Sequence, residues 1–363
     1  MQSQISNRFS SLDAFRGFAI AGMLLVNNPG TWDPNVVPRI LLHAEWHGCT
    51  FADLIFPFFL FAVGMAMPFS EARRIKLGIP LWKRVLVAAW RALLLYLLGA
   101  FLKSALINEP VLHFGILQRI GALYFAAYLL IRLHTKWLAG ISVVMLFVWW
   151  AILEFVQGPG VTPGSFERDI NAAQYLDSFI LAPEDKETIV SMIPGVSTVL
   201  FGVLAGRLLR AQKDRKMVMK SLVIAAVAGL AVGLLWDIIV PINKILWSSS
   251  FAVYTAGWSC LVFLSFYWLI EVRQKSKWAF PLIVYGLNAI TLYVATGLFV
   301  RWVMLSWKVP WEGSTTSLTG YFYRTFASFT SPTIGSILYS ALVLLIGWFL
   351  CYWMFLRKLF LKV

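Results

Sequence analysis

Charged residues are scarce in this sequence. Only 13% of its 363 residues are charged, 60% are hydrophobic, and the mean hydropathy is +0.75. A soluble domain is about one quarter charged, so this composition excludes an ordinary soluble fold. Acidic residues are rarer than basic ones, with 17 against 31, so the net charge is +14.

Cysteine is rarer still. Cys49, Cys260 and Cys351 show no motif spacing, and two of them lie within apolar runs, which argues against a disulfide framework. The sequence also lacks a nucleotide-binding loop, a linker and a clear internal repeat, so we expect a single domain over residues 1–363. Only a short polar tail precedes the first apolar run, and we expect that run to act as an uncleaved anchor.

Apolar runs of about twenty residues are abundant, and this is the length a helix needs to cross roughly 30 Å of hydrocarbon. The alternation over about ten residues that is typical of membrane β-barrels is missing. We therefore expect an all-α polytopic membrane protein, a bundle of about ten transmembrane helices. The expected spans are 12–28, 51–70, 84–104, 114–131, 136–156, 189–209, 218–240, 247–270, 279–302 and 334–356.

The basic residues are distributed unevenly between the two sides of this expected bundle. Twenty Lys and Arg residues fall on one side and eight on the other, while Arg16, Arg91 and Arg119 lie inside spans. Basic loops mark the cytoplasmic side of a membrane protein, so both termini are expected in the cytoplasm. The accumulation of basic residues on the cytoplasmic side of the lipid bilayer then explains the positive net charge, and we expect no nucleic-acid partner.

Three long loops are expected on the outer side, at 28–50, 157–188 and 303–333. The second is acidic, which can serve solubility alone or attract a cationic substrate, such as an amino sugar, by long-range steering. The third is polar and aromatic and suits a cover over a sugar site. The acidic residues of the second loop are Glu167, Asp169, Asp177, Glu184, Asp185 and Glu187.

The first outer loop carries two of the four histidines, His43 and His47, with Glu45 between them and Asp53 at the start of the next span. Residues four apart on a helical turn can hold a metal, but no third ligand stands out and we expect no metal. A second interpretation is a pair of interfacial histidines without chemistry. The third is a general base or covalent acceptor, since imidazole titrates near neutral pH. Asp53 would then orient the imidazole, and Asn27 would donate to an oxyanion.

Several polar residues lie where a membrane span should be apolar. Asp13 and Arg16 share a helix face, and they form either an ion pair or a site where Arg16 meets a phosphate of a cytosolic ligand. Five further polar residues lie within or at the ends of the expected spans. Each one alone suits a structural role, but together they suggest a polar cavity through the bundle. They are Gln118, Arg119, Asn243, Lys244 and Asn288.

Six segments carry unlike motifs in a specific order. They are RFSSLDAFRGFAIAGMLLVNN (8–28), HAEWHGCTFADLIFPFFLFAVG (43–64), FGILQRI (114–120), FGVLAGRLL (201–209), PINKILWSSSF (241–251) and YGLNAITLYV (285–294). This series resembles the heparan-α-glucosaminide N-acetyltransferase family over nearly the whole membrane domain. The active histidine of the family falls on His43 and its active-site asparagine on Asn27. His47 departs from the lysosomal enzyme, which has asparagine there, and is similar to bacterial members.

The resemblance implies an acetyltransferase of the bacterial inner (cytoplasmic) membrane, which is suggested to form a homodimer. Acetyl-CoA would bind from the cytoplasm as a co-substrate, and its acetyl group would pass to the amino group of a glucosamine-type sugar on the outer side. Arg16 is then the expected contact for a CoA phosphate. The expected substrate contacts are His47, Glu45, Gln118, Arg119, Asn243, Lys244 and Asn288.

The mechanism and two rival functions stay open at this point. His43 acts either as a base while the amine attacks the thioester directly, or as a nucleophile that is acetylated in a ping-pong reaction. An amino-sugar transporter would also be a bundle with a polar interior. Transporters usually carry helices interrupted near the midplane, whereas the polar residues here lie near span ends. A membrane acyltransferase with an O-linked acceptor is the closer rival.

Overall fold

The structure is a computed structural model that describes residues 9–107, 109, 115–179, 189–212 and 214–360. Within them the chain is helical except for loops and one short hairpin, and it is a multi-pass membrane protein. Seven helices are long and apolar enough to cross a membrane. They are α2 (Phe51–Lys76), α3 (Leu81–Ile107), α5 (Thr135–Phe155), α7 (Met192–Ala211), α8 (Arg215–Asp237), α9 (Ser249–Tyr267) with its π-helical extension η3 (Trp268–Val272), and α13 (Pro332–Leu356).

An eighth crossing is a bent pair of helices. It begins at η4 (Lys277–Ala279) and α10 (Phe280–Leu287), bends by 74°, and continues as α11 (Ala289–Phe299) and the π-helical η5 (Val300–Leu305). The sequence predicted a span over 279–302 but gave no indication of this bend. Asn288 has a non-helical backbone at the bend, and its side-chain amide donates to the carbonyl of Leu359 at 3.0 Å, which satisfies an acceptor beyond the end of α13.

The two remaining expected spans, 12–28 and 114–131, also form helices, but the second helix is short for a membrane crossing and the first carries two charged residues. The helix α4 (Ile116–Leu130) has 15 residues and is about 22 Å long at 1.5 Å per residue, less than the roughly 30 Å of hydrocarbon. The helix α1 (Ser10–Asn27) has 18 residues and carries Asp13 and Arg16. All ten expected segments are therefore helical, while seven or eight of them meet the length and composition needed to cross.

The helix α2 lies at the centre of the bundle and positions the site described below. Its apolar window is 83% buried, whereas that of α8 is 22% buried, so α8 presents most of its surface to lipid. The helices α2 and α7 approach closely at two glycines. A Cβ on Gly64 would lie 2.1 Å from the Val199 carbonyl oxygen, and one on Gly202 would lie 2.2 Å from that of Phe61. Small residues allow this backbone contact between membrane helices, which fixes the direction of α2.

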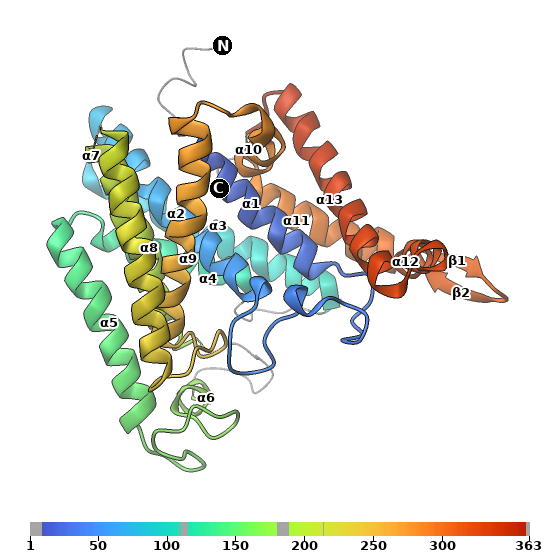
Figure 1. Cartoon of the computed structure of the whole chain (residues 1–363), viewed down its shortest axis with the longest axis horizontal. Coiled ribbons are helices and arrows are strands. Elements are labelled where there is room, and N and C mark those ends of the chain that lie inside the picture. Colours follow the sequence, from blue (N-terminus) through green and yellow to red (C-terminus); the bar gives the residue numbers. More distant parts are fainter. Residues whose placement is uncertain (1–8, 108, 110–114, 180–188, 213, 361–363) are drawn as a thin grey trace.

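The two ends of the bundle are built differently. The first turn of α1 lies at the end occupied by α10 and by Leu359, since a Cβ on Gly286 would lie 2.0 Å from the Asp13 carbonyl oxygen. We call this the basic end, because α2, α7 and α13 finish there with Arg73, Arg210 and Arg357. The opposite end, the loop end, carries residues 28–50, 157–179 and 241–248 (Figure 1, with α10 at the top and α6 at the bottom).

Short elements lie in all three of the expected outer loops. The first two loops hold one each, η2 (Arg39–Leu41) and α6 (Ala172–Asp177), and the third region is the segment 303–333, with the antiparallel hairpin β1 (Lys308–Trp311) and β2 (Ser314–Ser317) followed by α12 (Leu318–Phe329). The segment expected to be a loop is therefore ordered structure, and the hairpin departs from the all-α prediction. Its turn residues Glu312 and Gly313 both have positive φ, which suits the tight turns of hairpins. The hairpin projects away from the bundle (Figure 1).

Candidate active site

The site is built on the first turn of α2. Thr50 precedes the helix as its N-cap, and its backbone N–H donates to Asp53 Oδ2 at 3.0 Å. The Thr50 hydroxyl lies 3.1 Å from the same oxygen and 2.7 Å from the Leu42 carbonyl, so it ties the incoming loop to the helix. This is a capping box, in which the third helical residue returns a hydrogen bond to the cap. The box leaves the other carboxylate oxygen of Asp53 facing the loop.

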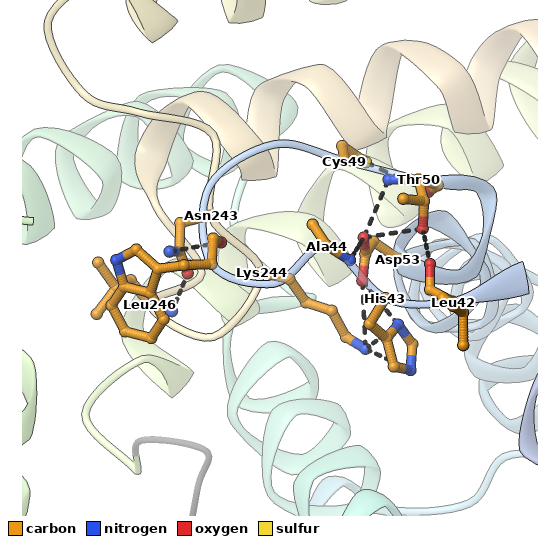
Figure 2. Close-up of polar contacts among 10 residues, drawn as sticks. Leu42, His43, Ala44, Cys49, Thr50, Asp53, Asn243, Lys244 and Leu246 are labelled. Atoms are coloured by element: carbon orange, nitrogen blue, oxygen red, sulfur yellow. Dashed lines mark hydrogen bonds and ion pairs between the residues drawn. The ribbon is translucent and has the colours of Figure 1, made fainter. Parts of the chain in front are cut away.

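That second oxygen holds His43. Asp53 Oδ1 lies 2.7 Å from His43 Nδ1, and Oδ2 also accepts the N–H of Ala44 at 3.0 Å. Asp53 is 1% exposed, whereas the His43 side chain is 46% exposed. A carboxylate at Nδ1 favours the tautomer with the proton on that nitrogen, which leaves Nε2 as the acceptor. Nε2 is then the ring nitrogen that can accept a proton, and Figure 2 shows the His43 ring next to Asp53 and the end of the Lys244 side chain.

Lys244 reaches the same ring from the segment between α8 and α9. Its Nζ lies 3.1 Å from Nδ1 and 3.3 Å from Nε2 of His43, and 3.7 Å from Asp53 Oδ1. The structure thus brings together three predicted site residues, His43, Asp53 and Lys244, from positions up to 201 residues apart.

The loop that carries His43 is fastened to two other segments. Asn243 is fully buried, and its Nδ2 donates to the Trp46 carbonyl at 2.9 Å. The Trp46 indole N–H donates to the Phe166 carbonyl at 2.8 Å. The guanidinium of Arg168 lies 5.0 Å from the Trp46 ring and donates to the Glu45 carbonyl at 2.6 Å. We call these contacts the Trp46 clamp, and they hold the His43 loop against residues 166–168 and 243.

The two histidines occupy different surroundings. His47 Nε2 lies 3.3 Å from Glu167 Oε1, and its Nδ1 lies 3.5 Å from Asn243 Nδ2. The segment between the histidines is irregular rather than helical, so their spacing of four does not bring them to one side of a helix. The Glu45 carboxylate is exposed and pairs with Arg39 at 3.5 Å. Among the described residues, no three His, Cys, Asp or Glu side chains form a group that could hold a metal ion.

Cys49 lies beside this cluster, and its surroundings disfavour the thiolate. Burial, with the negative charge of Asp53, raises the pKa of the Cys49 thiol to about 12, and the opposing charge of Lys244 does not offset this. A thiol becomes a nucleophile as its thiolate. The position of Cys49 therefore does not suit an acyl carrier at neutral pH.

The structure places several other predicted site residues elsewhere. Asn27 is exposed at the end of α1 and is not one of the described polar contacts of His43 or Asp53. Arg16 and Asn288 lie at the basic end, where Arg16 pairs with Asp13 at 3.6 Å and approaches the Gly286 carbonyl at 3.5 Å. Arg16 lies eleven residues before Asn27, which is about 16 Å along α1 at 1.5 Å per residue, so both residues are separated from the loop end.

Gln118 and Arg119 are buried in the first turn of α4. A Cβ on Gly99 would lie 2.1 Å from Gln118 Oε1, so this amide packs tightly against α3. In the acidic loop, the Asp177 carboxylate accepts the backbone N–H groups of Ile189 and Val190 and so has a structural use. Glu184, Asp185 and Glu187, for which solubility and the attraction of a cationic substrate were both left open, lie outside the described residues.

Two cavities among the described residues are lined mainly by apolar side chains. One, of about 340 Å³, lies between α2, α7, α8 and α9, and the other, of about 10 Å³, lies between α1, α2, α4 and α11. Neither is lined by a predicted site residue. The polar cavity through the bundle therefore stays a prediction.

Sequence reasoning missed the residues that hold the site in place. Thr50, three positions before Asp53, matches the pattern of a capping box, and this signal could have been found. Trp46, Phe166 and Arg168 gave no comparable signal, because their contacts join distant segments. A buried network at the basic end was also missed, in which Arg84 donates to Glu71 and Tyr128 donates to Glu71 at 2.6 Å.

Comparison with known proteins agrees with the expectation from the motifs. Residues 8–236 match the family described as heparan-alpha-glucosaminide N-acetyltransferase, catalytic. The heparan-alpha-glucosaminide N-acetyltransferase of Homo sapiens is 26% identical over 376 residues, and that of Mus musculus is 25% identical over 377. These alignments cover 85% of this chain but 55% and 56% of the relatives, so the chain spans about half the length of the curated relatives it matches. The matched family region is more than half of the chain, and the protein therefore belongs to the catalytic family of heparan-alpha-glucosaminide N-acetyltransferase, which implies acetyltransferase activity at the level of the family.

Proposed function

We propose that this protein transfers an acetyl group from cytosolic acetyl-CoA to the amino group of a glucosamine-type sugar on the outer side of a bacterial inner membrane. Family membership supports the reaction class. The observation that carries the site assignment is the 2.7 Å contact between Asp53 Oδ1 and His43 Nδ1, which makes His43 Nε2 the proton acceptor of the ring.

The proposed chemistry follows from this contact. His43 Nε2 accepts a proton from the sugar amine as the amine attacks the thioester carbonyl. Asp53 keeps the ring oriented and stabilises the imidazolium that forms. Asn27, at the end of α1, is proposed to donate a hydrogen bond to the acyl group. The imidazolium then protonates the departing CoA sulfur, which returns His43 to its neutral form.

The proposed orientation rests on the distribution of charge. The basic end faces the cytoplasm, because basic residues accumulate on that side of membrane proteins. His43 then faces outward, while CoA binds at the opposite face and its acetyl group crosses the bundle. This path is part of the proposal, as are the Arg16 contact to a CoA phosphate and the assembly of a homodimer.

Substitution of His43 tests the assignment. Acetyl transfer to glucosamine and release of CoA thiol would be measured for purified H43Q in detergent, with H134Q as the matched control. His134 is an exposed residue that caps α5 through the N–H of Lys136. We expect H43Q to lose about 10²- to 10⁴-fold in kcat and H134Q to keep it. A folded H43Q protein with normal turnover would reject the assignment.

Direct transfer and a ping-pong reaction differ in one intermediate. Rapid quenching with radiolabelled acetyl-CoA and no acceptor would trap an acetyl-enzyme only in the ping-pong case. Label that is present in the wild type and missing in H43Q would identify His43 as the acetylated residue.

One observation favours the transporter alternative. The 74° bend between α10 and α11 is an interrupted helix of the kind common in transporters, and the sequence did not predict it. Uptake of labelled glucosamine into proteoliposomes, measured beside CoA release, separates the two functions. Uptake without CoA release would favour transport, and CoA release without uptake would favour the transferase.

A further inference from the structure

Lys244 is held beside the reacting atoms rather than free in solvent. Its side chain is only 16% exposed. Its backbone carbonyl accepts the N–H of Trp247 at 3.1 Å, and the N–H of Ser248 bonds to the Asn243 carbonyl at 3.0 Å. With Asn243 fixed to Trp46, the turn at 243–248 directs the lysine side chain toward the ring of His43 (Figure 2).

The distances show that Lys244 does more than neutralise Asp53. Its Nζ is nearer to Nδ1 and Nε2 of His43, at 3.1 and 3.3 Å, than to the Asp53 carboxylate, at 3.7 Å. A lysine acting only as the partner of a buried carboxylate would be expected at hydrogen-bond distance from that carboxylate. Instead the ammonium lies at nearly equal distances from the two ring nitrogens of His43, and one of these is Nε2, the nitrogen that does not contact Asp53.

We infer that Lys244 is the cation that stabilises the negative charge developing on the acyl oxygen during transfer. This role rests on the proposed function. Any amine that gives its proton to Nε2 must attack a carbonyl carbon within a few ångströms of that nitrogen, so the carbonyl oxygen comes within reach of Nζ. A preorganised cation aimed at such an oxygen is a strong source of transition-state stabilisation.

The step balances in atoms and charge. The amine nitrogen forms a bond to the carbonyl carbon, its proton moves to His43 Nε2, and the carbonyl π electrons move to the oxygen. The new imidazolium faces Asp53, and the new oxyanion faces Lys244. When the oxyanion collapses, the C–S bond breaks and the thiolate takes the proton from His43. Lys244 remains an ammonium throughout, so it needs no deprotonation.

The test compares variants that remove or keep the charge. K244M has a similar length without an ammonium, K244Q is a second neutral variant, and K244R keeps the charge. K308M is the control, because Lys308 is exposed at the start of β1. We expect K244M and K244Q to lower kcat for acetyl transfer by about 10²- to 10³-fold, with the KM for glucosamine changed only a few-fold. K244R should recover part of the loss, and K308M should match the wild type.

Chemical rescue separates this role from a structural one. Propylammonium added to K244A should raise kcat in proportion to its concentration, because a small cation can occupy the vacated position. A loss through misfolding would not respond to it. Elution and thermal melting in detergent would establish that each variant is folded.

Three outcomes would overturn the inference. The first is normal kcat in folded K244M or K244Q, and the second is a loss confined to KM. The third is an acetylated Lys244 found by peptide mass spectrometry after incubation with acetyl-CoA, which would make the lysine a nucleophile. If the wild type itself transfers no acetyl group, the proposed function fails instead, so the two failures are distinguishable.

Discussion

The Asp53 carboxylate uses one oxygen to hold His43 and the other to begin the helix that positions it. Oδ1 lies 2.7 Å from His43 Nδ1, and Oδ2 accepts backbone N–H groups from the first turn of α2 and from the His43 loop. Orientation of the ring and the start of a central membrane helix therefore depend on the same side chain.

D53N tests this dual role. The amide can donate toward His43 Nδ1 and so favour the wrong tautomer, and we expect kcat to fall by roughly 10²- to 10⁴-fold. The weakened cap should also lower stability by about 1 kcal/mol, measured as a thermal shift in detergent. D33N is the control, because Asp33 caps only an exposed turn at Asn35. Full activity in D53N would show that the contact has no part in turnover.

The Trp46 clamp can be tested with a conservative change. W46F removes the indole N–H that donates to Phe166 while keeping an aromatic ring under Arg168. The His43 loop should lose part of its anchoring, and we expect kcat/KM to fall about 10-fold, because small displacements of catalytic groups are costly. W32F, at a residue that is 69% exposed in the same loop, should be neutral. Equal effects of the two changes would contradict the clamp.

Cys49 gives a prediction for pH dependence. With its pKa raised to about 12, only about one thiol in 10⁴ is ionised at pH 8, against roughly a quarter for an ordinary cysteine. In a C260S/C351S background, alkylation of Cys49 by iodoacetamide should be very slow at pH 8 and rise about tenfold per pH unit up to pH 10. C49A should keep its activity. Rapid labelling near pH 7 would contradict the assigned environment.

The contact between α2 and α7 predicts a large effect from one methyl group. In G202A the new Cβ would lie 2.2 Å from the Phe61 carbonyl oxygen, and separating the helices should cost about 1–3 kcal/mol. G140A is the matched control, since a Cβ there meets nothing within 4 Å. Thermal melting in detergent should show a clear decrease for G202A alone, and similar melting of both variants would argue against tight packing at Gly202.

The orientation of the bundle can be measured by labelling single cysteines in intact bacteria. In a background without native cysteines, R39C at the loop end should react with a membrane-impermeant maleimide. K277C at the basic end should react only after the cells are permeabilised. Both replaced side chains are exposed. The reverse pattern would place His43 in the cytoplasm and exclude transfer to an outer acceptor.

The sequence predicted the helices well because long apolar runs report directly on membrane crossing. It predicted the bend at Asn288 poorly, since both faces of a membrane helix are apolar and periodicity carries little information about a break. The hairpin at Glu312 and Gly313 was missed because an outer segment of this length was taken as a loop, although the glycine offered a turn signal.

Within the site, the pairing of His43 with Asp53 was predictable, because Asp53 follows His43 by only ten positions and lies in the first turn of the next helix. The position of Lys244 over the same ring was not, since that contact depends on how α8 and α9 pack against α2. For the same reason Arg16 and Asn288, grouped by chemistry in the sequence, lie at the opposite end of the molecule.

The fastening of the His43 loop by Asn243 and Lys244 has a consequence for biogenesis. His43 leaves the ribosome about 200 residues before the side chains that complete its surroundings, an interval of about 10–40 s at bacterial elongation rates of roughly 5–20 residues per second. During that time the nascent chain carries His43 and Asp53 but neither Asn243 nor Lys244. A fragment that stops after α8 would carry the whole matched family region, residues 8–236, yet lack Asn243 and Lys244, and we expect it to be catalytically inactive.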